Sequence, residues 1–371
     1  MKKSIWIYND LAFGGGAEVV LQKVANYLCC RGYRVTLTTK DPRSEIQNAY
    51  SEKIRYYSRA LREPRKKSRA LRLMWRVLNY TYRKVIVPLR DHRKYDVRIA
   101  FKNGSCARKT SKLRAKEKYV WIHVDYSTFY WTKERQGQEE TERRLLESFD
   151  KVICVSKAAG TAIKNTIGDP GNLTLAYNPI DYMAIRENAK AMIPIEKGDM
   201  PLFVSVGRIS PEKQFDILLT ACRNLQDKYR FQTWIIGDGY KYKYLKKRIE
   251  EENIFSVKLL GLQQNPFPYL AKADCYICCS KSECHPLAIQ EATVLGVPTI
   301  STYYPSACEV VAPGMGIIVD NQEQALQNAM EQILRSPETL SNWKRNIEEG
   351  FSAESLWLPR LKRIVDIIET D

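Results

Sequence analysis

The stretch from Ser280 to Thr302 constrains the fold of this chain more than any other. An apolar run, Ala273–Cys279, is followed by a polar loop that holds Glu283 and, after Pro286, by a short apolar segment with helical spacing. A second apolar run, Val297–Ser301, comes next. A strand, a loop, a helix and another strand form half of a βαβ unit, which predicts a parallel sheet. Ligands bind such sheets at the carboxyl ends of the strands, where this loop would lie.

Two carboxylates, Glu283 and Glu291, stand eight positions apart in this stretch. Each has an ordinary explanation, because Glu283 can be a solvated loop residue and Glu291 an acid that complements the helix dipole. The alternative is that both bind a ligand at the edge of the sheet. The rest of the chain decides between these two interpretations.

Length and composition predict a globular protein with two domains. The chain has 371 residues, more than one ordinary domain, and 44% of them are hydrophobic. The sequence contains no apolar run of eighteen residues, and its first apolar run is too short for a signal peptide, so we expect a cytoplasmic protein. Cys275 and Cys278 form a C-x-x-C pattern without a second ligand pair, which favours buried thiols over a zinc site.

The positive charge of the chain is concentrated in its first half. Residues 1–180 carry 37 Lys and Arg against 17 Asp and Glu, whereas residues 181–371 carry 22 against 25. This asymmetry predicts that the first half binds a polyanion, which could be anionic lipid, nucleic acid or a phosphorylated substrate.

Residues 53–94 are the most basic segment, with fifteen basic and two acidic residues. Within residues 59–94, apolar side chains recur at helical spacing and arginines lie between them. Such a pattern is typical of an amphipathic helix at an anionic membrane surface, and equally of a helix that packs its apolar stripe on its own sheet. Arg69, Arg72, Arg76 and Arg83 are the arginines, and the apolar stripe consists of Leu71, Met74, Trp75, Leu78, Tyr82, Val85 and Ile86.

The first half opens with a βαβ pattern. Ser4–Tyr8 and Arg34–Thr39 are predicted strands, and a helix is expected from Ala17 to Leu28. Three glycines, Gly14–Gly16, stand before this helix, where they would let the backbone come close to a ligand and aim free N–H groups at phosphate. They do not form the G-x-G-x-x-G motif of dinucleotide-binding proteins.

Further apolar runs continue the strand pattern through the chain. His123 lies at the end of one of them, at the predicted ligand-binding edge, although a lone histidine is more often structural. The motif Asn178-Pro179-Ile180-Asp181 is a turn and the expected linker between the domains. The predicted strands of this group are Asp96–Phe101, Tyr119–Val124, Lys151–Ser156, Leu173–Ala176, Leu202–Val206 and Val257–Leu262, and Trp234–Gly239 is predicted to be a strand followed by a turn.

Two cations flank the turn after the predicted strand Leu202–Val206. Arg208 and Lys213 lie on either side of Ser210 and Pro211, which we expect to begin a helix. Two cations at a strand-to-helix turn can hold a diphosphate, with arginine as the bidentate partner and lysine as the point charge.

Taken together, these motifs resemble a known family. The spacing E-x7-E followed by A-x-x-x-G-x-P-x-I, together with G-R-x-x-x-x-K, resembles the donor site of the retaining GT-B glycosyltransferases of family 4, also called group 1, of the bacterial surface-polysaccharide type. Where the family reads E-G-F-P, this chain has Glu283, Cys284, His285 and Pro286. The resemblance implies an α/β GT-B fold, in which two Rossmann-like domains face each other across a cleft.

The resemblance also implies roles for individual residues. Arg208, Lys213, Glu283 and His123 are the expected catalytic residues: the first two hold the diphosphate, and the other two face the donor sugar. Glu291 is expected to hold the ribose of the nucleotide. The remaining donor-site residues implied are Gly15, Gly16, Gly207, Leu262, Pro286 and Leu287. The family uses no protein nucleophile, and no metal or other cofactor is implied.

The expected domains are an acceptor-side domain over residues 1–178, with a possible membrane face, a nucleotide-sugar-binding domain over 179–355, and a C-terminal helix over 356–371 that returns to the first domain. The implied function is transfer of a hexose from a nucleotide-diphosphate sugar, a UDP-sugar by preference, to a lipid-linked glycan at the inner face of the cell membrane. Alternatives are a GT-B protein that only binds nucleotide sugar and an epimerase-like enzyme on the same fold. A nucleic-acid binder is less favoured, because the basic segment carries no recognition motif.

Overall fold

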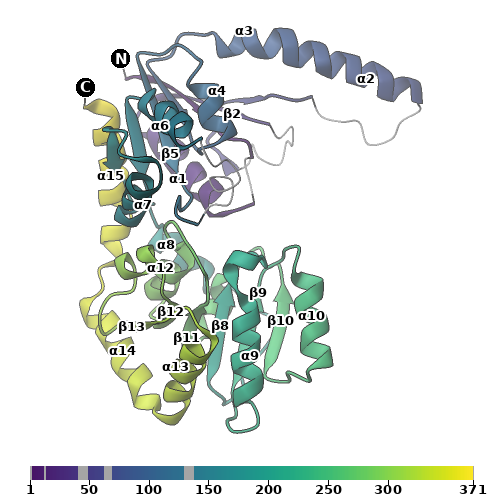
Figure 1. The fold of residues 1–371 in the computed structure, drawn as a ribbon, viewed down its shortest axis with the longest axis vertical. Helices are drawn as coiled ribbons and strands as arrows, with labels where there is room; N and C mark the ends of the chain where they lie inside the picture. The colour runs from purple at the N-terminus through teal and green to yellow at the C-terminus, as the bar shows by residue number, and fades with distance from the viewer. Residues whose placement is uncertain (1, 12–13, 41–48, 62–68, 129–137, 371) are drawn as a thin grey trace. The chain divides into compact units, whose positions relative to one another are not determined.

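The structure is a computed structural model that describes residues 2–11, 14–40, 49–61, 69–128 and 138–370. The chain divides into two compact units: Met1–Pro179 with Arg360–Asp371, and Ile180–Pro359. Each unit contains one parallel sheet with helices packed against it (Figure 1). The α/β fold class expected from the sequence is therefore confirmed.

The first unit is built on a sheet of seven strands in the order β3-β2-β1-β4-β5-β6-β7. Every neighbouring pair is parallel. The order runs outward in both directions from β1 and β4, which makes this a doubly wound sheet with its switch point between those two strands. The strands are β1 (Ser4–Tyr8), β2 (Arg34–Thr39), β3 (Arg55–Ser58), β4 (Val97–Ala100), β5 (Glu117–Ile122), β6 (Lys151–Cys154) and β7 (Leu173–Leu175).

In the region of the C-terminal helix expected over residues 356–371, the structure has a 3₁₀ turn, η5 (Ala353–Leu356), followed by the helix α15 (Leu358–Glu369). Two lysines of the first unit donate hydrogen bonds to the last carbonyls of α15: Lys3 Nζ to Ile368 O at 2.7 Å and Lys151 Nζ to Ile367 O at 2.6 Å. Cations are stabilising at a helix C-terminus, where carbonyls lack helical partners. The helices of the first unit are α1 (Gly16–Cys30), α2 (Arg69–Thr81), α3 (Val87–Asp91), α4 (Ser105–Thr110), α6 (Glu139–Glu147), α7 (Lys157–Ile167) and α15 (Leu358–Glu369).

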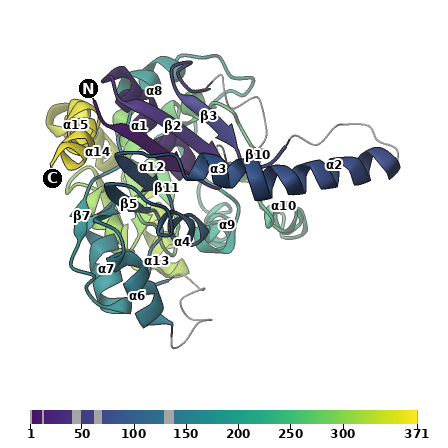
Figure 2. The same cartoon turned by 90° about the horizontal axis from the view of Figure 1, so that it is seen from above.

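An arm of consecutive helical segments follows β3. It consists of α2, a π-helical turn over Tyr82–Ile86 (η2) and α3, and α2 projects beyond the edge strand of its own unit (Figures 1 and 2). Pro88 has no N–H to offer the carbonyl of Lys84, which accounts for the widened turn just before it. The structure describes this part of the chain except for residues 62–68 and the side chains of residues 69 and 70.

The basic segment over residues 53–94 differs from the prediction in two respects. It begins with a strand, β3, which was not among the predicted strands. In addition, the apolar stripe predicted from the sequence is only partly exposed, because Trp75 and Tyr82 are half-buried. The most exposed apolar side chains of α2 lie between the stripe positions: Leu73 and Tyr80 are each 64% exposed and Val77 is 58% exposed.

The second unit is built on a six-stranded parallel sheet in the order β10-β9-β8-β11-β12-β13. Its switch point lies between β8 and β11. The strands are β8 (Leu202–Val206), β9 (Gln232–Ile236), β10 (Val257–Gly261), β11 (Cys275–Cys278), β12 (Thr299–Thr302) and β13 (Gly316–Val319). The helices are α8 (Tyr182–Asn188), η3 (Pro211–Lys213), α9 (Phe215–Leu225), α10 (Tyr242–Glu251), α11 (Phe267–Ala271), α12 (Leu287–Val294), η4 (Pro305–Glu309), α13 (Glu323–Arg335), α14 (Pro337–Gly350) and η5 (Ala353–Leu356).

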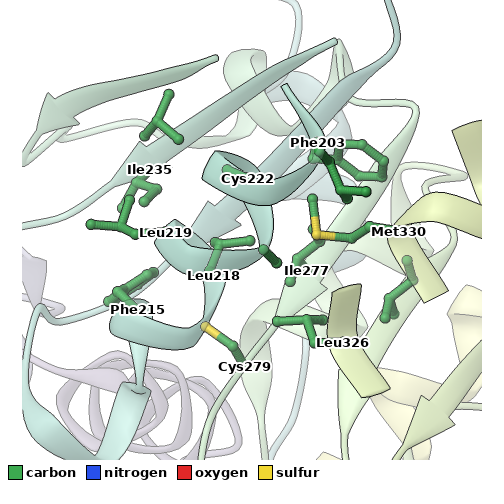
Figure 3. Packing of buried hydrophobic residues seen from close by; sticks show 14 of the residues in the cluster. Phe203, Phe215, Leu218, Leu219, Cys222, Ile235, Ile277, Cys279, Leu326 and Met330 are labelled. Atoms are coloured by element: carbon green, nitrogen blue, oxygen red, sulfur yellow. The ribbon is translucent and has the colours of Figure 1, made fainter. Parts of the chain in front are cut away.

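Apolar residues on both faces of this sheet form two cores. Phe203 and Ile277 point to the face covered by α9 and α13, where Leu218 and Met330 pack against them (Figure 3). Their strand neighbours, such as Val204, point to the opposite face, which α11 and α12 cover. Successive strand residues alternate between faces, and burial on both faces explains the continuous apolar runs of the sequence.

The same alternation separates the two cysteines of the C-x-x-C pattern. Cys275 belongs to one core and Cys278 to the other, so the two thiols lie on opposite faces of the sheet and cannot bind one metal ion. Both are free cysteines. In the part of the chain that the structure describes, no helix is long and apolar enough to cross a membrane.

Candidate functional site

The loops that follow β8 and β11 meet at the carboxyl edge of the second sheet. These strands are adjacent and parallel, so the loops that follow them emerge side by side. Lys213 in the first loop forms an ion pair with Glu283 in the second. Two of the residues predicted to be catalytic, seventy positions apart in the chain, are therefore in contact.

Lys213 is held by a turn that differs from the predicted one. The helix expected to begin at Ser210 is a 3₁₀ turn of three residues, and Gln214 then takes up the left-handed conformation (φ 48°). The helix α9 begins only at Phe215. The hydroxyl of Ser210 caps no helix N–H and instead lies 3.4 Å from the carbonyl oxygen of Arg208. The chain turns sharply at Gln214, and this turn keeps Lys213 beside the end of β8. A continuous helix from Ser210 would instead place Lys213 within its first turn.

Backbone contacts fasten the two loops together. The N–H of Lys281 donates to the carbonyl of Glu212 at 2.7 Å, and the thiol of Cys279 lies 3.1 Å from the carbonyl of Lys213. Gly207 lies beside the lysine stem: a Cβ built on it would make an ordinary contact with Lys213 Cε at 3.6 Å. The position of the ammonium group is thus set by the ends of both strands.

Glu283 is held from two sides. Its carboxylate accepts a hydrogen bond from Ser280 Oγ at 2.9 Å in addition to the ion pair, and its backbone carbonyl accepts one from Ser306 Oγ at 2.7 Å. The loop itself is anchored by Thr302, whose hydroxyl donates to the carbonyl of Ser280 at 2.7 Å. Asn321 Nδ2 donates to the same carbonyl at 3.2 Å. These supporting residues were not predicted, because isolated Ser, Thr and Asn side chains carry no distinctive spacing.

Two opposing effects act on the pKa of Lys213. Burial favours the neutral amine, but the negative charge of Glu283 and their hydrogen bond outweigh burial, so the pKa is raised above its ordinary value. Lys213 is therefore a cation at every physiological pH. In the free protein Glu283 already balances this charge, and an anionic ligand at Lys213 would compete with that carboxylate.

Glu283 and Glu291 lie at the same edge of the sheet. Burial raises the pKa of Tyr276 in β11, and the negative charges of Glu283 and Glu291 raise it further. Pro286 stands immediately before α12, at a position where no side chain caps the helix N–H groups. Glu291 lies in the second turn of α12 and is partly exposed.

Three other predicted donor-site residues of the second unit differ in how far they are exposed. Arg208 is exposed on the loop after β8, and Leu262, just beyond β10, is 74% exposed. Leu287 does not point into open solvent; it packs partly against Ile180 and Val294. Cys284 is almost fully buried beneath the loop.

Two glycines just beyond β9, predicted only as part of a turn, allow two loops at this edge of the sheet to pass close to each other. A Cβ on Gly237 would lie 1.9 Å from the carbonyl oxygen of Gly207, and one on Gly239 would lie 2.3 Å from that of Ile209. The loops after β8 and β9 therefore cross so closely that no side chain fits at either position. The G-D-G spacing directly after an apolar strand was the available signal.

The first unit has its own polar cluster at the carboxyl edge of its sheet. Glu18 is only 5% exposed, accepts a hydrogen bond from Asn9 Nδ2 at 3.0 Å and forms an ion pair with Lys102. Glu18 is therefore the buried partner of Lys102. Gly15 and Gly16 begin α1 without a side-chain cap, as expected for a helix start that offers free N–H groups.

His123 lies near this cluster, just beyond β5. Its ring is 5.1 Å from that of Phe101, and among the described residues its buried Nε2 atom has no hydrogen-bond partner. Burial and then the charge of Lys102 lower the pKa of His123 to about 3. The imidazole is therefore neutral at physiological pH and can exchange a hydrogen bond with a ligand hydroxyl, but it cannot act there as a cation.

The predicted site residues thus fall into two groups, one at the carboxyl edge of each sheet. Lys213, Glu283, Glu291 and their neighbours belong to the second unit, and the glycine turn and His123 belong to the first. Among the described residues, no group of three or more His, Cys, Asp or Glu side chains is arranged to hold a metal ion.

Two glycosyltransferase family models match this chain. The family model "Glycosyltransferase Family 4" matches residues 14–182, and "Glycosyl transferases group 1" matches residues 187–350. An uncharacterized glycosyltransferase of Methanocaldococcus jannaschii is 33% identical over 106 residues, which are 28% of this chain and 26% of that protein. The curated relatives are matched over 26% to 57% of their own length.

Two further similarities are informative. A Campylobacter jejuni enzyme, named N-acetylgalactosamine-N,N'-diacetylbacillosaminyl-diphospho-undecaprenol 4-alpha-N-acetylgalactosaminyltransferase, is 25% identical over 170 residues, 44% of this chain and 45% of that protein. Anabaena HepE, solved in complex with UDP and glucose, superposes with a TM-score of 0.76 at 17% identity and covers 100% of both chains. The two family models and this fold show that the chain belongs to the GT-B glycosyltransferases, with a family 4 domain followed by a group 1 domain.

Proposed function

We propose that this protein is a retaining glycosyltransferase that transfers a hexose from a UDP-sugar to a hydroxyl group of a lipid-linked glycan in surface polysaccharide synthesis. The observation that carries the proposal is the ion pair between Lys213 and Glu283 at the switch point of the second sheet. It places a permanent cation and a carboxylate side by side where nucleotide ligands bind in sheets of this type.

In the proposed reaction, the bond between the anomeric carbon and the β-phosphate oxygen breaks, and its electron pair leaves with the nucleoside diphosphate. The acceptor oxygen forms a bond to the same face of the anomeric carbon, and its proton passes to the departing phosphate. Lys213 and the nearby Arg208 stabilise the negative charge that develops on the phosphate, which favours the transition state over the ground state. Glu283 accepts hydrogen bonds from the sugar, and Glu291 accepts them from the ribose.

Two comparisons support the choice of donor and acceptor. HepE was solved with UDP and glucose, and the Campylobacter jejuni relative is named for a diphospho-undecaprenol acceptor. An acceptor of that class is anchored in a membrane, so we propose that the protein works at the cytoplasmic face of the cell membrane as a peripheral protein.

A screen of UDP-, GDP- and ADP-sugars tests this function. We expect turnover with a UDP-sugar, a product with the anomeric configuration of the donor by NMR, and full activity in EDTA, because two side chains supply the positive charge. Arg208→Ala should lower turnover by roughly 10²–10³-fold, the effect of removing one contact that stabilises charge in the transition state.

Three results would contradict the proposal. Tight binding of nucleotide sugar without transfer to any acceptor would make the protein a binding protein. Interconversion of free sugars would make it an epimerase-like enzyme, and inversion of the anomeric configuration would exclude the retaining mechanism.

A further inference from the structure

The helical arm over residues 69–91 presents an unusual surface. Between Pro64 and Arg90 the sequence contains no acidic residue. Leu73, Val77 and Tyr80 are nonetheless more than half exposed. A helix this rich in exposed apolar side chains normally buries them against another surface.

The most exposed apolar residues of α2 form one stripe, whereas Met74 and Leu78, elsewhere around the helix, are 54% and 52% exposed. With 3.6 residues per turn, Leu73, Val77 and Tyr80 stand at positions i, i+4 and i+7 and lie on one side of α2. Trp75 lies on the opposite side and is half-buried. We call Leu73, Val77 and Tyr80 the outer stripe. Arg76 and Arg72 come next to it around the helix, so that cationic groups border one side of the apolar stripe.

Among the described residues, several hydrogen bonds and an ion pair fasten the C-terminal part of the arm to its own unit. Tyr82 Oη donates to the carbonyl of Ser58 at 2.8 Å, and Asn79 Oδ1 accepts from the N–H of Leu61 at 3.0 Å. At the base of the arm, Asp91 is buried and forms an ion pair with Arg59 at 2.7 Å. These contacts involve the C-terminal part of the arm, from residue 79 onward. The helix α2 projects beyond the edge strand (Figures 1 and 2), and the outer stripe lies on its surface.

The base of the arm is also electrostatically secured. Arg98 of β4 is fully buried with its guanidinium 4.7 Å from the ring of Trp6. It donates to the carbonyls of Asp91 and Arg93, the latter at 2.7 Å. A buried arginine of this kind is costly to desolvate, so it must keep these carbonyls in place. The orientation of the arm is thus set by the core of the unit.

From these observations we infer that the outer stripe of α2 inserts into an anionic lipid surface while Arg72 and Arg76 contact the lipid headgroups. Charge decides between the possible occupants. A second copy of the arm would bring two helices without acidic residues together, and their like charges would repel. Nucleic acid would satisfy the arginines but would leave the apolar stripe in water, whereas an anionic bilayer accommodates both kinds of side chain.

This inference goes beyond the transfer reaction, because it names the surface and the side of the helix that bind lipid. Binding is measured without any nucleotide sugar, so either proposal can fail alone. The inference also revises the stripe predicted from the sequence: the tryptophan expected to enter the lipid, Trp75, faces away from it.

The test is co-sedimentation of the full-length protein with phosphatidylcholine vesicles that contain or lack about one third phosphatidylglycerol. We expect binding only to the anionic vesicles, weakened by salt because the Debye length shortens. The double variant Arg72→Gln, Arg76→Gln should bind about 30-fold more weakly, from the contribution of each surface arginine. In the variant Val77→Trp, the fluorescence of the added tryptophan should be quenched by brominated lipid.

A matched pair of variants tests the side of the helix. Serine at all three outer-stripe positions should abolish binding, whereas Leu71→Ser with Leu78→Ser, on the other side of α2, should leave most of it. Circular dichroism and turnover on a soluble acceptor must stay unchanged in both variants. Any loss of binding then results from the altered surface and not from unfolding.

Several outcomes would overturn the inference. These are equal binding to neutral vesicles, no binding to either kind, or equal losses from the two serine variants. Salt-sensitive binding of an oligonucleotide in place of vesicles would identify nucleic acid as the partner. A dimer in light scattering that dissociates in the outer-stripe variant would identify a second copy of the chain.

Discussion

Replacing Lys213 by methionine separates its proposed role in catalysis from its role in the fold. Methionine keeps an unbranched apolar stem of similar length beside Gly207, but it removes the charge that pairs with Glu283. The side chains of the pair are 25% and 18% exposed, so the carboxylate left behind would be only partly hydrated. It keeps one hydrogen bond, from Ser280 at 2.9 Å.

These facts set the expected magnitudes. Loss of a hydrogen-bonded charged partner at a partly buried site costs about 1–3 kcal/mol of unfolding free energy. Loss of one charge-stabilising contact to the leaving group lowers turnover by roughly 10²–10³-fold, or about 2.7–4 kcal/mol in activation free energy. The double variant Lys213→Met, Glu283→Gln removes the unpaired carboxylate. It should therefore recover most of the stability, but turnover should stay low because the cation is still missing.

Urea unfolding measures the first quantity and turnover of the UDP-sugar found in the screen measures the second. Stability and activity are expected to change independently across the single and double variants. Recovery of turnover together with stability in the double variant would refute the reasoning, because Lys213 would then act only by neutralising Glu283. An unchanged unfolding free energy in the single variant would show that the pair contributes nothing to the fold.

Three further predictions follow from single sites. Calorimetry with free UDP should show weaker binding for Glu291→Gln and no loss of affinity for Glu283→Gln, which should change turnover instead; equal losses in affinity would contradict this division of roles. Because the pKa of His123 is lowered to about 3, the unfolded chain binds the proton first, and stability should fall as the pH drops from about 6.5 toward 3. Between pH 7.5 and 5.0 the unfolding free energy should decrease in the wild type by up to about 2 kcal/mol more than in His123→Asn. Equal decreases would show that His123 does not cause this pH dependence. Gly237→Ala should destabilise the second unit by several kcal/mol, because its Cβ would overlap a backbone carbonyl; Gly296→Ala, with φ 75° and open space around its Cβ, should cost only the 1–2 kcal/mol of left-handed strain. Similar losses in both glycine variants would show that crowding is not the cause.

Much of the fold could be read from the sequence because buried parallel strands are continuous apolar runs. Ser4–Tyr8, Arg34–Thr39 and Leu202–Val206 begin and end where the pattern predicted. The strand β3 (Arg55–Ser58) escaped detection because it lies at the edge of the sheet and is only partly buried, so it carries no apolar run. A helical pattern begins soon after it, and the basic composition of the whole segment drew attention to the helix alone.

The edge of the sheet at which the site lies could be predicted, because it depends only on the order and direction of the strands. Lys213 and Glu283 follow adjacent strands of one sheet, so their loops had to emerge at the same edge. The pattern could not reveal which side chains pair there, because Glu18 and Glu283 look alike in sequence. One is buried against Lys102, and the other lies partly exposed beside Lys213. The break at Gln214 was equally hidden, since proline and an acid after Ser210 are the usual signals of a longer helix.

Under the proposed function, the pairing of Lys213 with Glu283 links recognition of the phosphate to recognition of the sugar. A diphosphate carries more negative charge than one carboxylate, so it competes effectively for the lysine. Glu283 is then left with the hydrogen bond from Ser280 and has oxygen lone pairs free for the hydroxyls of a sugar. A nucleotide without a sugar would leave this partly buried carboxylate without a full set of partners, which is unfavourable. The intact donor supplies both the replacement anion for Lys213 and the replacement hydrogen bonds for Glu283, and the site therefore favours the donor over the nucleotide product.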